Sequence, residues 1–189
     1  MDLIIKALNK AYELHKDQKR KVSNAPYFVH LIDTAKYLMY ETDKKEVICA
    51  GILHDTLEDT TYAEEELEKD FGKEITKLVK FCTEEGNNHN STKEEQKNSW
   101  EERKIKTLKK LEKGTEEELL VFCADKISTL LSIKEDIKTG NNIWEHLNGT
   151  KEKVKWYYTE IEKILEKKLK TKRILIIYKD LLKIFNEEQ

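Results

Sequence analysis

Residues 50–60 read Ala50-Gly-Ile-Leu-His-Asp-Thr-Leu-Glu-Asp-Thr60 and place one imidazole and three carboxylates within six positions. Residues four apart share a helix face, so we expect His54 over Glu58 and Asp55 over Asp59. The six residues before them are mostly apolar, so the polar groups are expected at the end of a buried helix. Burying them without partners would be costly, and a metal ion would compensate that cost.

Length and composition indicate one helical domain. The chain has 189 residues, which fits a single domain, and its six glycines and one proline favour long helices over an all-β fold. Thirty-five basic and 37 acidic residues give a net charge of −2. This balance argues against a nucleic-acid binder that relies on bulk charge.

The chain shows no sign of export or membrane insertion. It lacks a signal-peptide hydrophobic run at the N-terminus and any stretch near the roughly 20 apolar residues of a spanning helix. Its cysteines, Cys49, Cys82 and Cys123, are odd in number and form no C-x-x-C motif, which fits reduced thiols. We therefore expect a soluble cytoplasmic protein with no membrane partner.

Apolar periodicity predicts roughly eight to ten helices. The clearest are expected over residues 2–16, around 31–39, from about 44 into 54–55, around 75–82, around 105–111, around 119–131, around 154–164 and over 174–185. Residues 174–185 also fit a strand, but their period favours a helix.

Helix ends are expected at capping boxes and glycines. The predicted boxes are Thr61-x-x-Glu64, Ser99-x-x-Glu102 and Thr115-x-x-Glu118, and the predicted stops are Gly72, Gly114 and Gly140. Residues 84–98 contain no large apolar side chain and predict an exposed loop.

Two imidazoles and two carboxylates are candidate metal ligands: His30, His54, Asp55 and Asp125. This mixed nitrogen and oxygen set suits Mn²⁺, Fe²⁺, Co²⁺ or Zn²⁺ better than Ca²⁺ or a thiolate site. Such an ion would activate water and polarise a phosphoryl oxygen. Glu58 and Asp59, one turn further on, would orient that water or move protons.

Each candidate also has a structural interpretation when taken alone. Asp125 could pair with Lys126 or Arg103, and His30 could be a hydrogen-bonded core histidine. The other three histidines are interpreted as structural: His15, His89 and His146. Only the joint pattern favours a metal site.

That joint pattern resembles a known family. Pro26-Tyr27-x-x-His30-Leu31, Ala50-x-x-x-His54-Asp55-x-x-Glu58-Asp59-Thr60 and Ala124-Asp125-Lys126, in this order, resemble the HD-domain metal-dependent phosphohydrolases. The match is closest to the (p)ppGpp hydrolase branch, the hydrolase domain of the RelA/SpoT proteins and its small stand-alone relatives. The resemblance covers about residues 5–135.

The resemblance implies a role for each matching residue. His30, His54, Asp55 and Asp125 would bind one divalent ion, most often Mn²⁺ in this branch. Glu58 and Asp59 would position water against the 3′-pyrophosphate. Arg20, Lys21 and Lys126 would contact the nucleotide, although Lys19-Arg20-Lys21 also fits a solvated helix end.

One position departs from the branch. The Asp-Lys motif is expected to continue to an asparagine that helps hold the ribose or the site, and here Thr129 stands there. Threonine keeps a hydroxyl but loses the amide's donor and acceptor. This change bears on the substrate more than on the metal or the hydrolysis.

The sequence thus predicts an all-α, single-domain HD-domain fold with a buried mononuclear metal site. Residues 1–165 are expected to form the domain, and 166–189 a C-terminal helix packed on it. The expected function is metal-dependent hydrolysis of a nucleotide, first as a guanosine 3′,5′-bis(diphosphate) 3′-pyrophosphohydrolase. The alternatives are another nucleotide phosphohydrolase, such as a nucleotidase or NADPH phosphatase, a nucleotide-sensing module without turnover, and a helical scaffold without metal.

Overall fold

The computed structural model describes residues 2–84 and 92–186. Within these two ranges every regular element is a helix, and the single β-bridge joins Lys19 to Pro26. The all-α fold expected from the sequence is confirmed.

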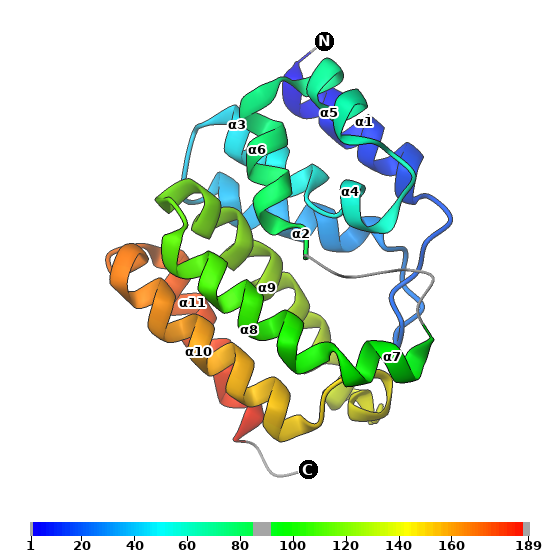
Figure 1. Ribbon diagram of the computed structural model, residues 1–189, viewed down its shortest axis with the longest axis vertical. Helices are drawn as coiled ribbons and strands as arrows, with labels where there is room; N and C mark the ends of the chain where they lie inside the picture. Colours follow the sequence, from blue (N-terminus) through cyan, green and yellow to red (C-terminus); the bar gives the residue numbers. More distant parts are fainter. Residues whose placement is uncertain (1, 85–91, 187–189) are drawn as a thin grey trace.

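The helices form two groups along the chain (Figure 1). The first group comprises α1 (Leu3–His15), α2 (Phe28–Met39), α3 (Lys45–Leu53), α4 (Thr56–Asp59), α5 (Glu64–Phe71) and α6 (Lys73–Cys82). The second comprises α7 (Lys93–Asn98), α8 (Trp100–Lys113), α9 (Glu116–Lys138), η1 (Ile143–His146), α10 (Lys151–Leu169), α11 (Arg173–Leu181) and η2 (Leu182–Phe185).

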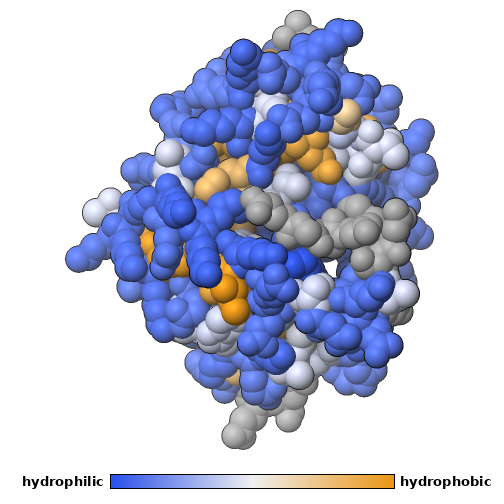
Figure 2. Space-filling model, viewed as in Figure 1, coloured by the Kyte–Doolittle hydropathy of each residue, from blue (hydrophilic) through white to orange (hydrophobic). Residues whose placement is uncertain are grey.

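Helix α9 is the centre of the packing. It contacts α2, α3 and α6 on one side and α10 and α11 on the other, so it joins the two groups. Residues around its circumference are therefore buried, including Leu119, Val121, Ile127 and Leu130. A helix that is apolar on nearly all sides belongs in a core. Polar side chains cover most of the outer face that Figure 2 shows.

The helix ends follow the predicted signals in part. Thr115 and Glu118 form the expected capping box, with Glu118 accepting from the Thr115 amide at 2.8 Å. The box predicted at Thr61 is wrong, because α5 begins three residues later, where Glu66 accepts from the Ala63 amide. Tyr62, just before that point, is buried, and its hydroxyl donates to Asp70 at 2.7 Å.

The predicted loop over residues 84–98 needs correction. Residues 93–98 form α7, which begins at a capping box between Thr92 and Glu95; residues 85–91 lie outside the described ranges. The capping box predicted at Ser99 is also wrong, because Ser99 belongs to the end of α7. Its amide and hydroxyl both donate to the Glu95 carbonyl. The polar composition of residues 94–98 reflects exposure on a helix rather than a loop.

The C-terminal segment is helical, as its periodicity indicates, with α11 followed by the short η2. Tyr157 and Tyr158 are buried, whereas the neighbouring Trp156 is 37% exposed. No helix within the described ranges has the length and apolar character needed to cross a membrane.

Gly51 permits the close approach of α3 to α2. A Cβ atom at this position would lie 2.2 Å from Leu38 Cδ1 and 3.4 Å from Thr34 Cγ2. Since Leu38 is fully buried, it has little room to move aside.

We expect Gly51→Ala to lower the free energy of unfolding by about 1–3 kcal/mol through overpacking. Thermal or denaturant unfolding measures this change. Leu38→Val removes the clashing Cδ1, so Gly51→Ala combined with Leu38→Val should cost less than the sum of the two single changes. If the losses of unfolding free energy from the two changes were strictly additive, the contact between Gly51 and Leu38 would be contradicted.

Candidate metal centre and cavity

The polar cluster begins where the chain bends between α3 and α4. Helix α3 ends at Leu53, and Asp55 has φ −95° and ψ −2° before α4 starts. The expected continuous helix is therefore interrupted at His54 and Asp55. Asp59 still lies near Asp55, whereas Glu58 Oε2 accepts from the Glu84 amide at 2.8 Å. Asp55 and Asp59 therefore lie close together, as expected, despite the bend.

Four side chains from α2, α9 and the α3–α4 bend converge at one point. His30 Nε2 lies 3.2 Å from His54 Nε2, 3.5 Å from Asp55 Oδ2 and 3.3 Å from Asp125 Oδ1. His54 Nε2 lies 3.0 Å from Asp55 Oδ2 and 3.6 Å from Asp125 Oδ1. Both imidazoles are nearly completely buried. The structure thus brings together all four ligand candidates.

Hydrogen bonds fix both imidazoles. His54 Nδ1 donates to the Gly51 carbonyl at 2.8 Å. The Ser128 hydroxyl donates to the His30 carbonyl at 3.3 Å and can therefore accept from His30 Nδ1, 2.8 Å away. With Nδ1 acting as the donor, each Nε2 presents its lone pair to the cluster.

Two lone pairs facing each other require a cation between them, either a proton on one Nε2 or a metal ion. Burial disfavours charge on His54, but Asp55 and Asp125 outweigh it and raise the pKa of His54 well above its ordinary value. Burial likewise opposes charge on both carboxylates, yet the adjacent imidazoles and, for Asp125, Lys126 hold their pKa values well below the ordinary range. A divalent ion would satisfy the same nitrogen and oxygen atoms, so the residues present fit such an ion.

Tyr27 links the cluster to the next acidic residue. Its hydroxyl donates to Asp55 Oδ2 at 2.6 Å and lies 3.2 Å from Asp59 Oδ2. Its ring stacks on His15, whose Nδ1 lies 2.7 Å from Gln18 Oε1. His15, interpreted from the sequence as structural, thus packs against the Tyr27 ring.

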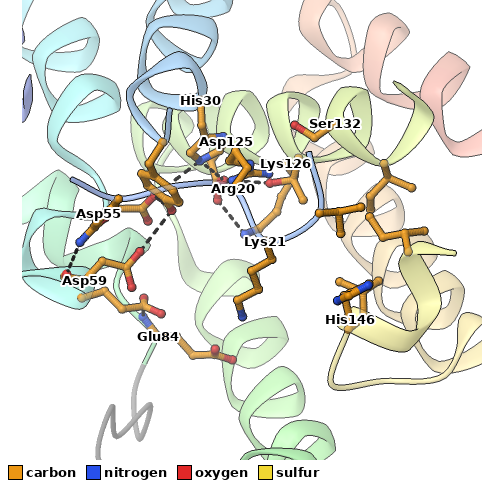
Figure 3. Close-up of a pocket in the computed structure, with 18 of the residues that line it drawn as sticks. Arg20, Lys21, His30, Asp55, Asp59, Glu84, Asp125, Lys126, Ser132 and His146 are labelled. Atoms are coloured by element: carbon orange, nitrogen blue, oxygen red, sulfur yellow. Dashed lines mark hydrogen bonds and ion pairs between the residues drawn. The ribbon is translucent and has the colours of Figure 1, made fainter. Parts of the chain in front are cut away.

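A cavity of about 630 Å³ opens beside the four converging side chains. His30, Asp55 and Asp125 lie at one end and His146 across from them, with Lys21 between (Figure 3). His146, interpreted from the sequence as structural, thus lies on the cavity wall. His89 lies outside the described residues.

The predicted substrate contacts all line this cavity: Arg20, Lys21, Lys126 and Thr129. Lys126 Nζ lies 2.6 Å from Asp125 Oδ2, which confirms that ion pair. The Thr129 hydroxyl lies 3.5 Å from Asp125 Oδ1, at the limit of a hydrogen bond. Arg20 lies over the Tyr27 ring, 5.5 Å from its centroid.

Three further residues of the site were not predicted from the sequence. The Glu84 carboxylate forms ion pairs with Arg103 Nη1 at 2.6 Å and Lys104 Nζ at 2.9 Å. Arg103 therefore pairs with Glu84 rather than with Asp125. Burial lowers the pKa of Lys104, which lines the cavity. Tyr27 was quoted only as part of a motif, whereas Glu84 and Lys104 carried no local signal.

Fold and site together define a helical protein with a candidate divalent-ion site beside a cavity lined by cationic side chains. The sequence matches a family model described as an HD domain over residues 7–150, and the chain belongs to this family.

Relatives of known name match part of the chain. A probable guanosine-3′,5′-bis(diphosphate) 3′-pyrophosphohydrolase of Mycoplasma pneumoniae is 36% identical over 136 residues, which are 70% of this chain and 18% of the relative. A guanosine-3′,5′-bis(diphosphate) 3′-pyrophosphohydrolase of Xenopus tropicalis is 40% identical over 87 residues, 44% of this chain and 48% of the relative. The chain therefore spans less than half the length of either.

Two solved structures share the fold over most of the chain. A metazoan orthologue of SpoT has a TM-score of 0.73 at 23% identity and is matched over 97% of this chain and 96% of its own. A Listeria monocytogenes protein has a TM-score of 0.71 at 30% identity, over 88% and 100%. The HD-domain resemblance drawn from the motifs is confirmed.

We expect Tyr27→Phe to weaken divalent-metal binding about 10- to 100-fold, because Asp55 loses the donor that orients it. Titration of the metal-free protein with Mn²⁺ measures the affinity. Tyr62→Phe is the matched control, since its hydroxyl donates to Asp70 at 2.7 Å and neither residue lines the cavity. Equal affinities for the two variants would rule out this role for Tyr27.

Proposed function

We propose that this chain is a divalent-metal-dependent pyrophosphohydrolase that removes the 3′-diphosphate of guanosine 3′,5′-bis(diphosphate). The observation that carries the proposal is the convergence of His30, His54, Asp55 and Asp125 at one end of a cavity lined by cationic side chains. The names of the matched relatives support this substrate.

The cavity suits a substrate with many negative charges. Its lining includes five cationic residues: Lys19, Arg20, Lys21, Lys104 and Lys126. Asp125 outweighs the effect of burial on Lys126 and raises its pKa, so this ammonium stays charged. Charge-assisted hydrogen bonds to phosphate are stronger than neutral ones and hold the diphosphate beside the ligand cluster.

The four converging residues would hold the ion, with Mn²⁺ as the proposed metal. When bound, this ion supplies Lewis-acid activation of water and of the phosphoryl oxygen. Glu58 and Asp59 would orient the attacking water and accept its proton. Contacts from the Glu84 amide and the Tyr27 hydroxyl hold these two carboxylates in place. Water adds to the phosphorus next to the ribose, and the bond from this phosphorus to the 3′-oxygen breaks. The 3′-oxygen keeps the electron pair and takes the proton that the carboxylates accepted from water, which gives a 3′-hydroxyl and free pyrophosphate.

Residues 1–165 would form the catalytic domain, with 166–189 packed on it as a C-terminal extension, and the protein would act in the cytoplasm on a small nucleotide. Helix α11, within that extension, packs on α9 and α10.

Thr129 favours a second candidate, another nucleotide phosphohydrolase such as a nucleotidase or NADPH phosphatase. The position lines the cavity next to Asp125 but offers a hydroxyl instead of the amide of the branch. A panel of ppGpp, pppGpp, NADPH, GTP, dGTP and nucleoside monophosphates with Mn²⁺ separates the two. Pyrophosphate from ppGpp supports the first candidate, and orthophosphate from another nucleotide supports the second.

Asp55→Ala is expected to lose metal and activity together, whereas Glu58→Ala should keep the metal and lose turnover by at least about 100-fold. Metal content and pyrophosphate release measure the two effects separately. Normal turnover in Glu58→Ala would overturn its catalytic role. If neither variant loses turnover, the activity belongs to another site. A wild-type protein that binds metal and nucleotide without turnover would be a sensor.

A further inference from the structure

One face of α9 lines the cavity from the metal-ligand cluster to its far end. The lining residues on this helix follow helical spacing: Phe122, Asp125, Lys126, Thr129, Ser132, Ile133 and Asp136. Figure 3 shows Ser132 further along this helix from Asp125 and Lys126. The cavity thus follows α9 from Asp125 to Asp136.

Asp136 lies at the far end of this face and is only 6% exposed. Its backbone carbonyl accepts from the Thr139 hydroxyl at 3.0 Å and from the Asn141 amide at 2.9 Å. Among residues 2–84 and 92–186, no hydrogen bond or ion pair reaches its carboxylate. Its oxygens are not fully buried and remain open to donors from a ligand in the cavity.

Apolar side chains also line this cavity. Ile133 and Ile143 are 2% and 5% exposed, and Val22 and Leu147 belong to the same lining. Apolar walls with one or two placed polar groups are typical of sites that hold a flat organic ring. The surroundings therefore fit a nucleobase better than a second phosphate.

The length of the cavity fits the same assignment. Asp125 and Asp136 are eleven residues apart on one helix, which corresponds to about 16 Å along its axis. An extended purine nucleoside with a diphosphate on its ribose spans a comparable length. With the diphosphate beside Asp125, the edge of the base reaches Asp136.

We propose that Asp136 is a specificity-determining residue that accepts hydrogen bonds from the N1–H and 2-amino groups of guanine. This inference rests on the proposed function and adds the group that selects the base. Guanine offers two adjacent donors that match the two carboxylate oxygens. Hypoxanthine offers one donor, and adenine presents the acceptor N1, which the carboxylate repels. A site built to pair with donors rejects analogues that lack them.

The test compares kcat/KM for the 3′,5′-bis(diphosphates) of guanosine, inosine, xanthosine and adenosine. Wild-type protein should prefer guanosine over inosine by about 10-fold or more, the value of one charge-assisted hydrogen bond. Asp136→Asn should lose about 10- to 100-fold with guanosine. It should gain relative activity with xanthosine, because the asparagine amide donates to the 2-oxo group that replaces the 2-amino group.

Asp180→Asn is the matched control, because it makes the same chemical change on an exposed residue of α11, paired with Lys183. Retention of the wild-type base preference in Asp136→Asn, with metal content and fold unchanged, would overturn the inference. If Asp136→Asn does not fold, the wild-type protein still tests the inference. A preference for guanosine over inosine below about 3-fold is less than one charge-assisted hydrogen bond provides and would overturn the inference. Failure of the proposed function is distinct: the wild type would then hydrolyse none of the four nucleotides.

Discussion

His30 Nε2 and His54 Nε2 lie 3.2 Å apart inside a helical core, and the rest of the structure depends on this contact. Two imidazole lone pairs repel each other unless a cation lies between them, and burial removes the water that would otherwise separate them. Asp55 and Asp125 supply the negative charge that balances this cation. Because these groups come from α2, α9 and the α3–α4 bend, those elements must pack tightly, as the approach at Gly51 shows.

Much of this arrangement could be predicted from the sequence. Helical periodicity located the main helices, because each buries an apolar stripe against neighbouring helices, and the Thr115 capping box is local chemistry that needs no tertiary context. The assembly of His30, His54 and Asp125 is different, since these residues are far apart in the chain. Their proximity followed from the resemblance of the ordered motifs to a family and not from spacing alone.

The remaining parts depend on contacts between distant segments, which no local pattern records. The bend at Asp55 replaces a helix that periodicity would continue, because the carboxylate must turn toward His30 and His54. Glu84 joins the site through contacts with distant residues, namely Glu58 on α4 and Arg103 and Lys104 on α8. Helix α7 was missed since it buries no apolar stripe and is held by its capping box and by contacts with α8.

The two imidazoles differ in how their Nδ1 partners can change during evolution. The partner of His54 is the main-chain carbonyl of Gly51, which every residue at that position would retain. The partner of His30 is the hydroxyl of Ser128, which one substitution can remove or replace. Drift in the sequence can therefore adjust the basicity of one imidazole while that of the other stays constant. Descendants of this chain that acquire a different metal preference are expected to have changed first at position 128.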